Sequence, residues 1–340
     1  MFLEGLGNWT FGSTIVAAIL LIVGLALIIK SGDIFVDASA WTADELHIPK
    51  FLIGVTIVSF ATTLPELLVS IFAVIEGSYD IGIANAVGSV TANTGLILAI
   101  SAIFVGSTIN RKDFGIKGII IILTNIILLA FCLTGKFGIL PSVLLIILFI
   151  VHMTFTIISA KKNDSNVSKV IEIAEEVTET KKSTRKEKIV NILKFIFGAI
   201  GIAVGAKLLS DNAIRVATDL HIPEGIIGIT IVAIGTSLPE LVTTITSIVK
   251  KQGELGVGNV IGANIIDLVL ILPVCSFIAN GNLEVSRQAY MLDIPVLLVL
   301  SLIAVVPTLI TKKFNKIQGI LMLVIYIAYV ITAAIVFVNK

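Results

Sequence analysis

The stretch HIPKFLIGVTIVSFATTLPEL at residues 47–67 returns, without a gap, as HIPEGIIGITIVAIGTSLPEL at residues 221–241. The same offset of 174 residues aligns ANAVGSVTANTGLIL (84–98) with GNVIGANIIDLVLIL (258–272). Long matches at one fixed offset indicate an internal repeat. We therefore expect the chain to consist of two halves of the same design.

Both copies lie in a very hydrophobic chain. Of its 340 residues, 56% are hydrophobic and 14% are charged, and the mean hydropathy is +1.07. Soluble proteins carry about 25% charged residues. Apolar runs of about 20 residues recur from end to end, which predicts an all-α, polytopic membrane protein in contact with lipid. The net charge of +1 gives no indication of a nucleic-acid partner. The two cysteines, Cys132 and Cys275, lie in apolar runs and are interpreted as buried thiols.

Ten transmembrane helices are predicted, five in each half. Residues 1–160 form the first repeat, 161–187 a solvated linker rich in Lys, Glu, Ser and Thr, and 188–340 the second repeat. The predicted spans are 13–38, 50–75, 80–105, 116–134, 139–159, 188–217, 224–249, 254–279, 289–311 and 316–338.

An odd number of spans in each half makes the second half enter the membrane from the opposite side, which predicts an inverted-topology repeat. Lys and Arg of short loops favour the cytoplasmic side. They therefore place the linker in the cytoplasm and both termini outside the cell membrane. The residues behind this orientation are Arg111, Lys112, Lys250, Lys251, Lys312, Lys313 and Lys316 on one side, against Lys136, Arg215 and Arg287 on the other.

Each half carries a proline within its second span. Thr62-Thr63-Leu64-Pro65-Glu66 and Thr236-Ser237-Leu238-Pro239-Glu240 are predicted to break these helices near the middle of the bilayer. Proline cannot donate to the carbonyl four residues earlier, so the carbonyls of Ala61 and Gly235 are freed. Such backbone is tolerated at membrane depth where it lines a cavity or is buried in protein. Each break therefore offers carbonyl, hydroxyl and carboxylate oxygens together.

Three acids lie deep in predicted spans, where an ionisable residue indicates function. Glu66 and Glu240 are twins at the offset of 174, and Asp267 is the twin of Asn93, with Ser89 one helical turn before Asn93. Carboxylate, amide, hydroxyl and carbonyl oxygens suit Ca²⁺ and also Na⁺. Without His or Cys among them, zinc, copper and iron are not expected. No cofactor is predicted, and three scattered histidines do not form the nucleophile–base pair or metal cluster of an intramembrane enzyme.

Other residues keep two interpretations. The twins Asp37 and Asp211, near the ends of their spans, fit either solvation at the membrane interface or a role in ion access. Asp293 either faces a cavity or pairs with a cation. The small residues Gly88, Gly262 and Ala263 fit close helix packing better than ligand binding.

The motifs GTSLPE (235–240) and GNVIGANIID (258–267), with ATTLPE (61–66) and NAVGSVTAN (85–93), resemble the α-repeats of the cation/calcium exchanger superfamily. The resemblance is to its prokaryotic sodium/calcium exchanger branch and covers nearly the whole chain. It implies a calcium site on Glu66 and Glu240 with the carbonyls of Thr62 and Thr236. It implies sodium sites that use Thr63, Ser237, Ser89, Asp267 and carbonyls near Ser59 and Ala233, with help from Asn93. It also implies that spans 13–38 and 188–217 slide together. Ala263 and Thr63 stand where the family has serine, and Val90 where it has asparagine.

Charge predicts antiport. Empty carboxylates in a low-dielectric core are costly to carry across a membrane, so Ca²⁺ or several Na⁺ must neutralise them before the carrier switches. The alternatives are proton/calcium exchange, in which a buried carboxylate carries H⁺, and potassium-dependent exchange. A channel is disfavoured because both halves lie in one chain. We expect a monomer to suffice for transport; the sequence does not give the oligomeric state.

Overall fold

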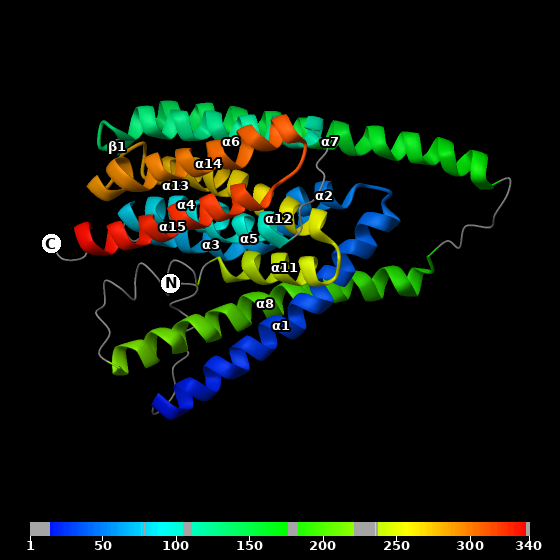
Figure 1. The fold of residues 1–340 in the computed structure, drawn as a ribbon, viewed down its shortest axis with the longest axis horizontal. Coiled ribbons are helices and arrows are strands. Elements are labelled where there is room, and N and C mark those ends of the chain that lie inside the picture. The colour runs from blue at the N-terminus through cyan, green and yellow to red at the C-terminus, as the bar shows by residue number, and fades with distance from the viewer. Residues whose placement is uncertain are drawn as a thin grey trace.

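The computed structural model describes residues 14–75, 77, 79–104, 111–175, 183–220, 235 and 237–337, and nearly all of them are helical (Figure 1). In chain order, with η for a π-helical segment, the helices are α1 Thr14–Glu45, α2 Lys50–Ile53, η1 Gly54–Val58, α3 Ser59–Ile75, α4 Tyr79–Ala92, η2 Asn93–Leu98, α5 Ala99–Phe104, α6 Arg111–Cys132, α7 Ile139–Glu175, α8 Arg185–Asp219, α11 Leu238–Val249, α12 Gly253–Ile266, η4 Asp267–Ile271, α13 Leu272–Ile278, η5 Ala289–Asp293, α14 Ile294–Thr311 and α15 Lys316–Phe337.

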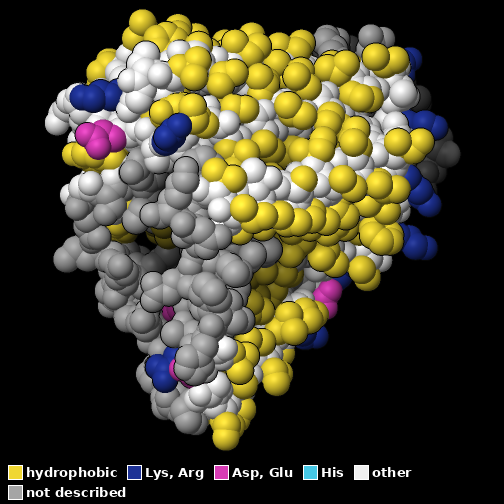
Figure 2. All heavy atoms as spheres, turned by 60° about the vertical axis from the view of Figure 1, so that its left-hand side comes forward, with side chains coloured by type: hydrophobic (Ala, Val, Ile, Leu, Met, Phe, Trp, Pro, Cys, Tyr) yellow, Lys and Arg dark blue, Asp and Glu magenta, His cyan; other side chains and the backbone are white. Residues whose placement is uncertain are grey.

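Nine helical stretches within these described ranges are long and apolar enough to cross a membrane. They agree with nine of the predicted spans to within a few residues at most ends. The larger differences are that α1 continues to Glu45 and that α7 continues as helix to Glu175, into the predicted linker. In the predicted span 224–249, the described part is the short apolar helix α11. Figure 2 shows one face on which hydrophobic side chains cover a wide area and many Lys and Arg side chains lie at the edge.

A two-residue β-ladder was not expected from the sequence. β1 (Lys136–Phe137) pairs antiparallel with β2 (Leu283–Glu284), so that Lys136 stands opposite Glu284. The ladder joins the α6–α7 connection to the chain that follows α13. It lies at the same end of the bundle as the start of α1 and the end of α15. The last residues of α7 and the first residues of α8 lie at the opposite end (Figure 1).

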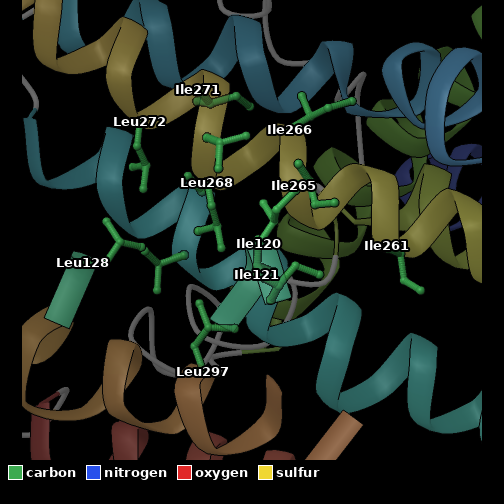
Figure 3. Close-up of a cluster of buried hydrophobic side chains, with 14 of the residues drawn as sticks. Ile120, Ile121, Leu128, Ile261, Ile265, Ile266, Leu268, Ile271, Leu272 and Leu297 are labelled. Atoms are coloured by element: carbon green, nitrogen blue, oxygen red, sulfur yellow. The ribbon is translucent and has the colours of Figure 1, made fainter. Parts of the chain in front are cut away.

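The main hydrophobic core surrounds α12 and the segments that continue it. Every residue of α12 from Leu255 to Ile266 is buried. Side chains from α6, η4, α13 and α14 complete this core, among them Ile121, Leu268 and Leu297 (Figure 3). A helix buried on all sides needs apolar or small residues around its whole circumference, which the 258–272 stretch supplies.

The pair α1 and α8 crosses outside this core (Figure 1). Glycines bring the two helices together: a Cβ atom built on Gly205 would lie 3.0 Å from the carbonyl oxygen of Gly24. Phe35 of α1 stacks near Phe195 of α8, with ring centroids 4.7 Å apart. A second, smaller hydrophobic cluster, which includes Phe35, Ile53 and Leu255, joins the pair to η1 and α12.

The internal repeat is visible in the element boundaries. The helical run 79–104 (α4, η2, α5) recurs at 253–278 (α12, η4, α13), and α1 and α8 end at the twins Glu45 and Asp219. The π-helical segments η2 and η4 begin at the twins Asn93 and Asp267. Equivalent sequences in the two halves have therefore folded into equivalent elements.

Candidate functional site

The sequence predicted that the helix would break at Pro65, and this prediction is wrong. Residues 50–75 remain helical, and Pro65 lies inside α3. A membrane helix tolerates proline when neighbouring groups satisfy the freed backbone. The irregularity of this span is instead the wide turn η1, just before α3. In the second half, α11 begins at Leu238 with Pro239 in its first turn, where a missing N–H is not costly.

Glycines bring the first-half span onto α12. A Cβ on Gly258 would collide with the carbonyl oxygen of Phe51, and one on Gly54 would collide with that of Leu255. A Cβ on Gly262 would collide with the Ser59 hydroxyl, which confirms close packing as the role of this glycine. Thus α12 lies backbone against backbone along α2, η1 and the start of α3, and the two motifs meet.

The three predicted acids are all enclosed. Glu66, Glu240 and Asp267 are each 1% exposed. Within the described part of the chain, no ion pair joins any of the three to Lys or Arg. Buried carboxylates are costly unless they are paired with positive charge or coordinate metal ions, so this arrangement favours bound cations.

Hydroxyl and amide groups surround the acids. Thr63 Oγ1 donates to Glu240 Oε1 over 3.2 Å, which links the two halves directly. Thr62 Oγ1 donates to Asn259 Oδ1 at 3.0 Å and contacts the Ser59 carbonyl at 3.3 Å. Ser59, Thr62, Thr63, Ser89, Asn93 and Ser237 are all buried.

Several buried oxygens on predicted site residues have no hydrogen-bond partner among the described residues. They are Glu66 Oε2, Glu240 Oε2, Asp267 Oδ1, Asn93 Oδ1 and Ser237 Oγ. More than 90% of buried polar groups in proteins are paired. Unpaired buried atoms also occur outside the site, for example on Thr124 and His152, but these five lie on predicted ligands and call for an explanation. Oxygens that serve as cation ligands provide one.

The carboxylates alone do not make a metal site. Among the described residues, no group of three or more His, Cys, Asp or Glu side chains is placed to hold a metal ion. Because Ca²⁺ takes about 6–8 oxygen ligands, hydroxyl, amide and backbone oxygens must supply the remainder. Two predicted ligand positions, Thr236 and Ala233, lie outside the described residues.

Three asparagines were missed as site residues. Asn85 Nδ2 donates to the Glu66 carbonyl oxygen at 3.2 Å, and Asn259 accepts from Thr62. Asn264 Nδ2 donates to Thr94 Oγ1 at 2.9 Å, across the two halves. Asn85 and Asn259 are twins at the repeat offset and belong to the quoted motifs. The sequence signal for Asn85 and Asn259 was that both halves have an amide at the same position of a membrane span.

The structure gives contacts for the acids with two interpretations. Asp37 Oδ2 lies 2.8 Å from Lys250 Nζ, and Asp211 pairs with Lys207 on the same helix. Asp293 accepts a hydrogen bond from the Tyr329 hydroxyl at 3.1 Å. Whether Asp37 and Asp211 act in ion access stays a prediction. Cys132 and Cys275 are buried and free, as predicted.

Several known proteins have sequences similar to that of this chain. A family model described as "Sodium/calcium exchanger protein" matches residues 16–158 and 190–335. An uncharacterized membrane protein of Methanocaldococcus jannaschii is 34% identical over 309 residues, covering 90% of this chain and 94% of that protein. The sodium/calcium exchanger MaX1 of Methanosarcina acetivorans is 27% identical over 341 residues, covering 92% and 97% respectively.

A solved structure shows the same fold. The sodium-calcium exchanger NCX_Mj, soaked with Na⁺ and Sr²⁺, superposes with a TM-score of 0.77 at 30% identity, over 94% of this chain and 99% of that one. The family match covers most of both halves, and the fold match covers nearly the whole chain. The chain therefore belongs to the sodium/calcium exchanger protein family and is a prokaryotic-type, multi-pass membrane antiporter of Na⁺ and Ca²⁺.

Proposed function

We propose that this antiporter binds Ca²⁺ and Na⁺ in turn on Glu66, Glu240 and Asp267 and exchanges them by alternating access. The observation that carries the proposal is the set of buried, unpartnered oxygens on those acids, on Asn93 and on Ser237. The remaining proposed ligands are Thr62, Thr63, Ser89 and Ser59, with Thr236 and Ala233 from the sequence motif.

Charge explains why the two ions exclude each other. With no cation bound, three enclosed carboxylates have no paired Lys or Arg among the described residues. One Ca²⁺ or several Na⁺ neutralise them, and either occupancy lowers the cost of moving the site across the bilayer. Because both ions need Glu66 and Glu240, occupancy by one requires release of the other.

The proposed architecture is ten spans in two inverted repeats. Its support is the equal element boundaries of the two halves and the position of α11 within the remaining expected span, 224–249. We further propose a cytoplasmic linker at residues 161–187 and extracellular termini in the plasma membrane. This proposal requires the linker and the termini to lie on opposite sides of the membrane. In support, the end of α7 and the start of α8 lie at one end of the bundle, and the start of α1 and the end of α15 lie at the other (Figure 1).

The decisive experiment measures ⁴⁵Ca²⁺ uptake into proteoliposomes and compares outward gradients of Na⁺, H⁺ and K⁺ as the driving force. We expect uptake driven by Na⁺ alone, abolished in Glu66→Gln and in Glu240→Gln. Glu254→Gln, which changes an exposed carboxylate in the first turn of α12, serves as the matched control and should exchange normally. Uptake driven by a pH gradient without Na⁺ would assign proton/calcium exchange instead. Normal exchange by either of the Glu66 and Glu240 variants would refute the proposed ion site.

A further inference from the structure

Asn85 and Asn259 occupy twin positions, on α4 and on α12. Each follows a small residue in its motif, Ala84 or Gly258, and each reaches a residue near Pro65. Asn259 is fully buried and Asn85 is partly buried. A carboxamide at such depth is expensive unless it makes hydrogen bonds, so these bonds indicate what each residue does.

Asn85 acts through its NH₂ group. Nδ2 donates to the carbonyl oxygen of Glu66 at 3.2 Å and to Ser70 Oγ at 3.0 Å. Glu66 and Ser70 are one helical turn apart in α3, so a single amide holds that turn from within the same half. The contact fixes the backbone that carries the Glu66 carboxylate.

Asn259 acts through its oxygen. Oδ1 accepts from Thr62 Oγ1 at 3.0 Å, and this bond crosses from the second half to the first. Its Nδ2 has no partner within the described residues, and neither does Thr244 Oγ1, the twin of Ser70. The described hydrogen bonds of both asparagines therefore end on the same short segment, Thr62 to Glu66, and its neighbour Ser70.

We propose that Asn85 and Asn259 are positioning residues for calcium binding, which hold the Thr62–Glu66 segment from its own half and from the opposite half. Neither needs to touch the ion. Residues that orient metal ligands commonly change affinity by about 10-fold when removed. The inference rests on the proposed ion site, because it assigns their effect to ligands of that site.

The two asparagines use opposite ends of the carboxamide, and this difference provides the test. Asn259→Asp keeps an oxygen that accepts from Thr62, so its half-saturating Ca²⁺ concentration should stay within about twofold of the unmodified protein. Asn85→Asp replaces the donor with an acceptor facing the Glu66 carbonyl and should raise that concentration about 10-fold. Both variants add one negative charge, and the charge is more deeply buried in Asn259→Asp, so desolvation alone would make that variant the weaker binder, opposite to the expected order.

A double-mutant cycle tests the bond between the halves. Asn259→Leu and Thr62→Val should each raise half-saturating Ca²⁺ about 5- to 10-fold, and the double variant should be no worse than either single one. Thr62→Val reaches the bond without altering α12, so a folding failure of Asn259→Leu does not prevent the test. Direct ⁴⁵Ca²⁺ binding to purified protein is measured beside the maximal exchange rate.

Wild-type affinity in Asn259→Leu and Thr62→Val, equal defects in both Asp variants, or additive effects in the cycle would each overturn the inference. Glu66→Gln separates this failure from that of the proposed function. If Glu66→Gln still binds Ca²⁺, the ion site itself is wrong. If Glu66→Gln loses binding while the asparagine variants bind normally, only the positioning role is wrong.

Discussion

The α1–α8 pair and the α12 core are both packed through glycine, yet they differ in burial. In α12–η4–α13, 78% of the most apolar stretch is buried, against 28% in α1 and 22% in α8. Lipid-facing side chains such as Ile22, 64% exposed, cover the outer side of α1. Most of the core stretch is thus enclosed by protein, whereas most of the apolar surface of the pair is exposed. The exposed pair is the better candidate for sliding, and the enclosed core for a fixed ion site.

The largest effect is expected where backbone meets backbone in the core. In Gly258→Ala the new methyl group collides with the Phe51 carbonyl and lies near Gly54 Cα, so the helices must separate. Overpacking of this kind should cost about 3 kcal/mol of stability. Gly115→Ala is the control, because its methyl group meets only the end of the Leu309 side chain, at 3.2 Å. Thermal unfolding in detergent should give a clearly lower Tm for Gly258→Ala. Equal Tm values would mean that the close contact is not required.

A smaller and different effect is expected in the pair. Gly205→Val places its side chain against the Gly24 carbonyl oxygen and the Ile28 nitrogen, each 3.0 Å from the point that a Cβ atom on residue 205 would occupy. If α1 and α8 slide during transport, exchange should slow about 10-fold while Ca²⁺ affinity is unchanged, because the ligands are elsewhere. Stopped-flow Ca²⁺ flux and equilibrium binding separate the two quantities. Ile29→Ala, on the exposed side of α1, should leave both unchanged. A loss of affinity without a loss of rate in Gly205→Val would assign the pair to the site instead.

The smallest effect is expected at the ion pair between α1 and the end of α11. Lys250 Nζ lies 2.8 Å from Asp37 Oδ2 and 3.6 Å from Asp33 Oδ1. The Asp37 side chain is 65% exposed, so water and salt screen this contact. Lys250→Gln should change the exchange rate by less than about threefold, an effect that disappears near 1 M salt. Lys251→Gln is the matched control for charge. A larger, salt-independent change would show that the contact limits the motion of α1.

The repeat made much of the fold predictable. Apolar length located nine of the spans, and the offset of 174 correctly paired 79–104 with 253–278. The π-helical segments were not predictable. Hydrophobic periodicity locates a helix but does not distinguish α-helical from π-helical hydrogen-bond spacing. The continuation of α3 through Pro65 was missed because proline was interpreted from local sterics alone. The β1–β2 ladder joins residues far apart in sequence and has no local signal.

The acids of the site were predictable, whereas the contacts of the asparagines beside them were not. Glu66, Glu240 and Asp267 stand out because charge is rare in a membrane span, and all three are buried as expected. Asn259 hydrogen-bonds Thr62 across 197 positions of sequence, and the amide shared with its twin Asn85 indicates a common role without indicating this partner. The effect of Ala263 in place of serine on sodium binding stays a prediction.

The wide turns at Asn93 and Asp267 also bear on the ancestry of the chain. A π-helical turn holds about one residue more than the α-helical turn it replaces, so inserting a single residue into an α-helix can produce one. Both halves carry that extra residue at the same place, and the offset between them stays free of gaps. One insertion before the duplication accounts for both turns, where two later insertions would have had to coincide. On this account the extra residue would be older than the repeat itself.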